Sequence, residues 1–229
     1  MMENDQPFNS RAIEERYLGV KERVWRAAGR HGRDPASVKL VAVTKTFVEE
    51  DIEPVLREGH CFFGENRVQE AMGKWPALRE RYPAIELHLI GPLQTNKVKE
   101  AVGLFDCLQT VDRPRLAAAL ASEIQRRGKT PKLLIQVNIG VEPQKAGIAP
   151  AETAAFARQC RQDFGLNISG LMCIPPFDED PVPYFEKLAA LRDELGLAEL
   201  SMGMSGDFED AIGAGATIVR VGSAIFGGR

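Results

Sequence analysis

Residues 39–45 read Lys-Leu-Val-Ala-Val-Thr-Lys, an apolar run rich in β-branched residues that ends on a lysine. Similar runs of four to seven residues recur along the chain, at residues 60–63, 86–90, 107–111, 132–137, 168–174, 200–204 and 217–221. Their side chains are almost continuously apolar instead of alternating, which is typical of parallel strands covered on both faces. The sequence therefore predicts eight parallel strands, the first over residues 39–44.

Longer amphipathic stretches separate the predicted strands. In residues 113–127, Leu116, Leu120 and Ile124 share one face, and Gly128 follows as a stop signal. Comparable patterns predict helices at residues 10–28, 66–81, 150–162 and 183–195.

This alternation of strands and helices predicts an α/β protein. Eight strands favour a (β/α)8 TIM barrel over an open doubly wound sheet, which more often has about five to seven strands. No Pro-, Gly- or Ser-rich linker marks a second domain. We therefore expect one domain over residues 1–229, with an extra helix before the first strand and residues 1–9 as a loose tail.

The composition argues against several classes of partner. The 229 residues include 29 Lys and Arg against 32 Asp and Glu, a net charge of −3, whereas a dedicated nucleic-acid binder normally has a basic surplus. No apolar run approaches the ~20 residues that cross a bilayer. The polar, acidic N-terminus does not resemble a signal peptide. We expect a cytoplasmic monomer that binds neither nucleic acid nor membrane, and the scattered cysteines and histidines predict no metal site.

Polar residues gather where the predicted strands end, which is the rim that carries chemistry in such barrels. Lys45 ends the first strand, where partial desolvation would make its amine a better nucleophile toward carbonyls. The alternative is a lysine that extends to solvent or pairs with Glu65. Ser205 follows the seventh strand, and Gly222 with Ser223 follows the eighth. Loops at these two places commonly bind phosphate, although ordinary turn and capping chemistry also explains them.

Closure of the barrel would place the eighth strand beside the first. A phosphate held by Ser205, Gly222 and Ser223 would then lie about one small cofactor's length from the Lys45 amine. A lysine nucleophile beside a phosphate site is what pyridoxal phosphate requires.

Arg220 has the same strand parity as Gly222, so its side chain is expected to point toward the site. A guanidinium cannot accept a proton, and as the partner of a pyridine nitrogen it would keep that nitrogen unprotonated and the ring a poor electron sink. The alternative for Arg220 is an internal ion pair with Glu65 or Asp207.

At these residues the sequence resembles the pyridoxal phosphate homeostasis proteins, which are single-domain relatives of the N-terminal barrel of alanine racemase. The motifs that carry the resemblance are VAVTK (41–45), FGENRVQE (63–70), HLIGPLQTNK (88–97), SMGMSGD (201–207) and RVGSAIFG (220–227). The resemblance covers about residues 10–229. One departure is Leu87, where the family often has a tryptophan, and it leaves the packing beside His88 open.

The resemblance implies a role for each residue of the predicted site. Lys45 would form the Schiff base, Arg220 would face the pyridine nitrogen, and Asn66 would lie near the ring. The phosphate ligands would be Ser205, Gly222 and Ser223.

Two functions from different classes follow from this site. The first is a non-enzymatic carrier that holds pyridoxal 5'-phosphate and buffers or delivers it in vitamin B6 homeostasis, with apo forms of pyridoxal-phosphate enzymes as partners. The second is an amino-acid racemase, which needs a second base. In related racemases this base is a tyrosine from a C-terminal β domain, whereas Tyr17, Tyr82 and Tyr184 all fall in or beside predicted helices here. The carrier is therefore favoured. A barrel that binds a sugar phosphate without covalent chemistry is a third reading, but it leaves Lys45 without a role.

A polar loop follows the fifth predicted strand, over residues 138–148. Loops of this kind on the catalytic rim often act as lids. Lys145 lies in it, and one hypothesis is that this second amine moves the aldehyde from Lys45 to an acceptor by transimination. The alternative is an exposed loop lysine.

Overall fold

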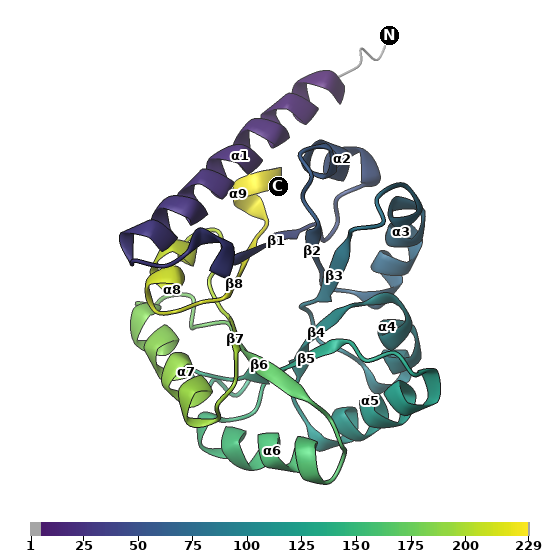
Figure 1. Cartoon of the computed structure of the whole chain (residues 1–229), viewed down its shortest axis with the longest axis vertical. Coiled ribbons are helices and arrows are strands. Elements are labelled where there is room, and N and C mark those ends of the chain that lie inside the picture. The colour runs from purple at the N-terminus through teal and green to yellow at the C-terminus, as the bar shows by residue number, and fades with distance from the viewer. Residues whose placement is uncertain (1–5, 229) are drawn as a thin grey trace.

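Each apolar run of the sequence forms a strand in the computed structural model, which describes residues 6–228. The strands are β1 (Lys39–Val43), β2 (Phe62–Glu65), β3 (Glu86–Leu89), β4 (Cys107–Val111), β5 (Lys132–Val137), β6 (Ile168–Cys173), β7 (Glu199–Ser201) and β8 (Ile218–Val221). They are parallel and follow one another in chain order around a closed barrel (Figure 1). The predicted (β/α)8 TIM barrel is confirmed.

Helices connect the strands and cover the outside of the barrel (Figure 1). They are α1 (Gln6–Arg30), α2 (Glu49–Arg57), α3 (Val68–Arg81), α4 (Val98–Leu104), α5 (Pro114–Arg127), α6 (Pro150–Gln162), α7 (Val182–Glu194), α8 (Phe208–Gly213) and α9 (Ser223–Phe226), with short 3-10 helices at Pro35–Ser37 and Thr95–Lys97. None of those in the described part of the chain has the length and apolar character that a bilayer crossing needs.

Several element boundaries differ from the sequence prediction by one or more residues, including those of α1, β2 and β7. Helix α1 begins at Gln6, so residues 6–9 are helical and not a loose tail, while residues 1–5 lie outside the described residues. Strand β2 extends to Glu65 because Gly64 and Glu65 pair with β3. Strand β7 ends at Ser201, before Gly203, where the backbone takes a φ of +90° that a strand does not allow.

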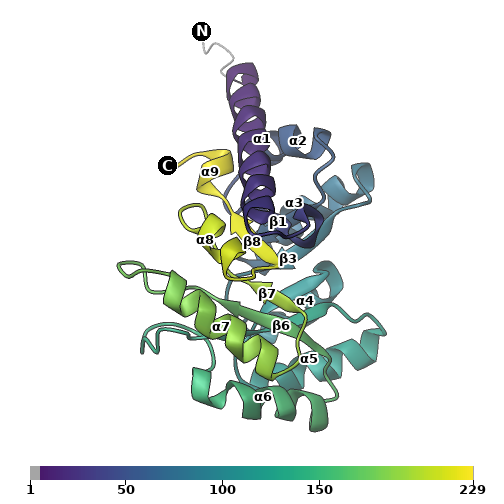
Figure 2. The same cartoon turned by 60° about the vertical axis from the view of Figure 1, so that its left-hand side comes forward.

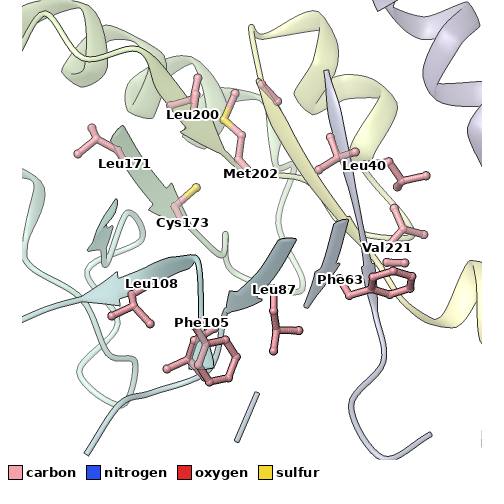
Figure 3. Close-up of a cluster of buried hydrophobic side chains, with 14 of the residues drawn as sticks. Leu40, Phe63, Leu87, Phe105, Leu108, Leu171, Cys173, Leu200, Met202 and Val221 are labelled. Carbon is pink, nitrogen blue, oxygen red and sulfur yellow. The ribbon is translucent and has the colours of Figure 1, made fainter. Parts of the chain in front are cut away.

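Strand residues alternate between the barrel interior and the helix layer. Val41, Cys107, Leu134, Met172 and Ile218 form the apolar cluster inside the barrel. Residues of the opposite parity form the larger core under the helices, which Figure 3 shows through Leu40, Phe63, Leu87, Leu108, Leu171, Leu200 and Val221. Leu87, the residue at which the sequence departs from the motif, therefore packs in the helix layer, whereas its neighbour His88 points into the barrel.

Helix α1 packs against the two helices that follow β7 and β8 (Figure 2). The Arg23 guanidinium forms an ion pair with Glu209 of α8 at 2.7 Å, and Arg16 Nε donates to the Ile225 carbonyl of α9 at 2.7 Å. The extra helix thus holds the elements that begin at the predicted phosphate loops.

Candidate functional site

A cavity of about 450 Å³ opens at the carboxyl ends of β1, β2 and β8. Four of the six predicted site residues line it, namely Lys45, Asn66, Gly222 and Ser223. Ser205 adjoins it, because its Oγ accepts a hydrogen bond from the Ala224 amide at 3.3 Å. The structure thus brings these residues together, while Arg220 lies deeper, inside the barrel.

Lys45 lies two residues beyond Val43, the last residue of β1, and its side chain is exposed to the cavity. No residue in the described part of the chain makes a hydrogen bond or ion pair with its ammonium group. The next residue, Thr46, has a φ of 69°, an uncommon conformation for a β-branched residue. The Thr46 amide donates to the Glu70 carboxylate at the start of α3, which holds this backbone in place.

The sequence alternative of a Lys45–Glu65 pair is not what the structure contains. Glu65 points away from the cavity and is fully buried, where its Oε1 atom lies 2.7 Å from Lys74 Nζ. The same oxygen accepts from Thr44 Oγ1 at 2.7 Å and from Trp75 Nε1 at 3.0 Å. The Glu65 carboxylate is therefore bound within the layer between the barrel and the helices, and it does not pair with Lys45.

Lys74 also fastens the turn that carries Lys45. Its ammonium donates to the carbonyl oxygens of Thr44 at 2.9 Å and Phe47 at 3.0 Å, which lie before and after Lys45 in the chain. Sequence reasoning missed this anchor. The available signal was the spacing of Glu70 and Lys74, which fits an ion pair on one helix face and is seen at 3.7 Å.

Two close backbone approaches shape the cavity wall. A Cβ atom on Gly222 would lie 3.3 Å from the carbonyl oxygen of Val43, so glycine lets the loop after β8 lie against β1. A Cβ atom on Gly91 would lie 2.3 Å from the Asn66 carbonyl oxygen, so the loop after β3 supports Asn66 only because residue 91 is glycine.

Arg220 points into the barrel, as its strand parity predicts, and is 4% exposed. One terminal nitrogen donates to Ser201 Oγ at 2.7 Å and the other to the Cys173 carbonyl oxygen at 2.8 Å. No carboxylate among the described residues pairs with it, so the expected alternatives at Glu65 and Asp207 are absent there. Burial lowers the pKa of Arg220. Its five N–H groups exceed these two bonds, which leaves donors for a ligand.

Lys145 lies on the rim but is not among the residues that line the cavity. Its Nζ donates to the Pro175 carbonyl oxygen at 3.0 Å and pairs with Glu142 at 2.5 Å. The Asn138 side chain ties the loop together, donating to the Glu142 carbonyl at 2.8 Å and accepting from the Glu142 amide at 3.1 Å. The loop is thus internally bonded.

The chain has clear relatives among known proteins. Residues 21–229 match the family model described as alanine racemase, N-terminal domain. The pyridoxal phosphate homeostasis protein of Aquifex aeolicus is 41% identical over 224 residues, covering 94% of this chain and 97% of the relative.

Solved structures show the same likeness. PipY of Synechococcus elongatus PCC7942, determined with PLP bound, superimposes with a TM-score of 0.79 at 35% identity, over 94% of this chain and all of that one (100%). Alanine racemase of Corynebacterium glutamicum shares the fold alone, with a TM-score of 0.70 at 20% identity over 96% of this chain and 62% of that chain. With relatives of this identity along nearly its whole length, the chain belongs to the pyridoxal phosphate homeostasis protein family, within the wider family of alanine racemase N-terminal domains.

Proposed function

We propose that this protein binds pyridoxal 5'-phosphate as a Schiff base on Lys45 and buffers or delivers it in the cytoplasm, without catalysing a reaction of its own. The observation that carries the proposal is the Lys45 amine, which has no partner among the described residues and shares one cavity with Gly222 and Ser223. The curated relatives are named for pyridoxal phosphate homeostasis, and PipY was solved with PLP bound.

The residues present fit the chemical groups of this cofactor. An amine condenses with an aldehyde to form a C=N bond and release water, and Lys45 supplies the amine. Hydroxyl groups of Ser205 and Ser223, with the close backbone at Gly222, suit a phosphate. The Arg220 guanidinium can donate to a ring nitrogen but cannot protonate it readily, because arginine keeps its proton. Such a ring is a weak electron sink, which favours storage over reaction.

The positions of the tyrosines support a carrier over a racemase. Tyr17 is buried on α1, where its hydroxyl meets His60 Nδ1 at 3.2 Å, and the Tyr184 hydroxyl donates to Glu179 at 2.5 Å. Tyr82 follows the last residue of α3. None of the three lines the cavity as the structure describes it, so none stands where a second base would be needed.

Borohydride trapping tests the proposal. The purified protein is incubated with pyridoxal phosphate, reduced and measured by intact-mass spectrometry, alongside Lys45→Ala and, as a control on the same rim, Lys145→Ala. We expect one adduct on the wild type and on Lys145→Ala, and none on Lys45→Ala. Full adduct formation on Lys45→Ala would overturn the assignment. Incubation with amino acids in deuterated water tests the racemase alternative, since exchange of the α-proton would show catalysis.

A further inference from the structure

A file of hydrogen bonds leads from Arg220 across the interior of the barrel. The guanidinium donates to Ser201 Oγ of β7 at 2.7 Å, and Ser201 Oγ donates to Gln109 Oε1 of β4 at 2.6 Å. The Gln109 amide nitrogen then lies 2.8 Å from His88 Nδ1 of β3. These four side chains come from four strands, and each is at most 4% exposed.

The file continues toward the opposite end of the barrel. His88 Nε2 lies 3.0 Å from Glu86 Oε1, and the same carboxylate oxygen accepts from Lys39 Nζ at 2.9 Å. Glu86 and Lys39 begin their strands and are partly exposed. The file therefore connects a buried cation below the cofactor cavity with a carboxylate near the other face.

The order of donors and acceptors fixes every proton in this file. A guanidinium only donates, so the Ser201 hydroxyl accepts from it and directs its own proton to Gln109. The amide oxygen of Gln109 is thereby occupied, and its nitrogen donates to His88 Nδ1. His88 consequently holds its proton on Nε2 and donates it to Glu86. Only a neutral imidazole can do both.

The electrostatics agree with this order. Burial lowers the pKa of His88, which keeps the imidazole neutral, and the hydrogen bond from His88 lowers the pKa of Glu86 to about 2. An uncompensated buried cation is costly, and no carboxylate among the described residues touches Arg220. The oriented dipoles of Ser201, Gln109 and His88 offset part of this cost, while Glu86 at the end of the file forms its ion pair with Lys39.

We propose that Gln109 and His88 are positioning residues of the cofactor site, which act through Ser201 to hold the Arg220 guanidinium oriented toward the cofactor's ring nitrogen. This inference rests on the proposed function, in which Arg220 meets that nitrogen. A long side chain fixed before binding loses less conformational freedom when the ligand arrives, so it contributes more to affinity and to discrimination. The file supplies this fixing through Ser201, which accepts from one terminal nitrogen of the guanidinium.

A pair of ligands separates this role from a general structural one. Dissociation constants are measured for pyridoxal phosphate and for its analogue with carbon in place of the ring nitrogen. The variants are Gln109→Met, which removes both hydrogen bonds of the amide, and Thr110→Val as control. Thr110 is the next residue on β4, is equally buried, and has no hydrogen-bond partner for its hydroxyl among the described residues.

We expect the wild type and Thr110→Val to prefer pyridoxal phosphate by roughly tenfold, the size expected for one hydrogen bond from a charged donor. Gln109→Met should reduce this preference to less than threefold, whatever it does to the affinity for both ligands. An unchanged preference in Gln109→Met would overturn the positioning role of the file but not the assignment of Arg220. Equal binding of the two ligands by the wild type overturns the assignment of Arg220 and this inference with it, while leaving the Schiff base on Lys45 to the trapping experiment.

A second measurement uses only the wild type and so does not depend on the stability of a variant. Nitrogen-15 spectra should show His88 as the neutral Nε2–H form between pH 6 and 8. Adding pyridoxal phosphate should shift its two nitrogen resonances, although the cofactor does not touch it, and adding the carbon analogue should shift them less. A protonated His88, an Nδ1–H form, or equal shifts with the two ligands would contradict the proposal.

Discussion

Gly222, the residue after β8, lies close against Val43 of β1, with 3.3 Å between the Val43 carbonyl oxygen and the place a Cβ atom on residue 222 would occupy. This approach brings the loop after the last strand against the strand that presents Lys45, although 177 positions separate residues 45 and 222 in the sequence. It follows from barrel closure, in which Val41 pairs with Arg220.

Gly222→Ala should therefore weaken the binding of pyridoxal phosphate by at least tenfold and destabilise the protein by about 1 kcal/mol, a typical cost of overpacking. The φ of −118° at residue 222 suits any residue, so the effect comes from the contact and not from backbone strain. Calorimetric titration and thermal unfolding measure the two effects. Gly19→Ala is the control, because a Cβ atom there would meet nothing within 4 Å. Wild-type affinity in Gly222→Ala would show that the close approach is not needed.

Ser205 and Ser223 should differ in what they contribute. Each alanine substitution is expected to weaken binding of pyridoxal phosphate by roughly 10- to 100-fold, through loss of a hydrogen bond to a charged phosphate. Only Ser205→Ala should also lower the unfolding temperature, because Ser205 Oγ accepts from the Ala224 amide while Ser223 is exposed. Pyridoxal without its phosphate is the control ligand and should bind all three proteins alike. If both variants kept wild-type affinity for the phosphate form, the phosphate would be held elsewhere.

The sequence predicts the barrel well because its strands are short, apolar and regularly spaced. Strand parity alone also places Arg220 inside the barrel, and the glycine-serine turns follow β7 and β8 as expected. The partners of Arg220 could not be predicted. Whether Ser201 and Gln109 meet depends on the stagger between strands around the barrel, which no local pattern records. The partner of Glu65 could not be predicted either. Strand parity turns its side chain toward the helix layer, but no local pattern shows that it meets Lys74 of α3 there.

Lys74→Met should destabilise the protein by about 3–5 kcal/mol, because it leaves the Glu65 carboxylate buried without its cation. The double variant Glu65→Gln/Lys74→Met removes both charges, so we expect it to be more stable than Lys74→Met alone. Chemical denaturation of the wild type, Glu65→Gln, Lys74→Met and the double variant gives the coupling free energy between the two charges. Additive losses would mean that the two charges do not stabilise each other.

Stability should fall as the pH is lowered from 7 to 5, in part through His60. Burial lowers the pKa of His60 to about 4, from an ordinary value of 6.5. Between these two pKa values the unfolded chain binds a proton at His60 that the folded protein does not bind. The contribution of His60 to the free energy of unfolding is therefore complete above pH 6.5 and is lost as the pH falls toward 4. His60→Phe keeps an aromatic ring beside Phe63 and removes the titration. Its free energy of unfolding should depend less on pH over this interval, and an identical slope would exclude His60 as a source.

Lys145 remains a candidate for the second amine in cofactor release, and its contacts sharpen the test. Its ammonium is held by Glu142 and by the Pro175 carbonyl oxygen, so it can react only after these contacts open. If it takes the aldehyde from Lys45 by transimination, Lys145→Ala should slow transfer to an apo-enzyme acceptor and leave the equilibrium affinity nearly unchanged. Glu142→Gln should have the opposite effect on the rate, because it weakens the contact that occupies the amine. Stopped-flow mixing of the loaded protein with the acceptor measures both rates. Equal rates in the wild type and both variants would remove Lys145 from the route and leave direct hydrolysis at Lys45 as the means of release.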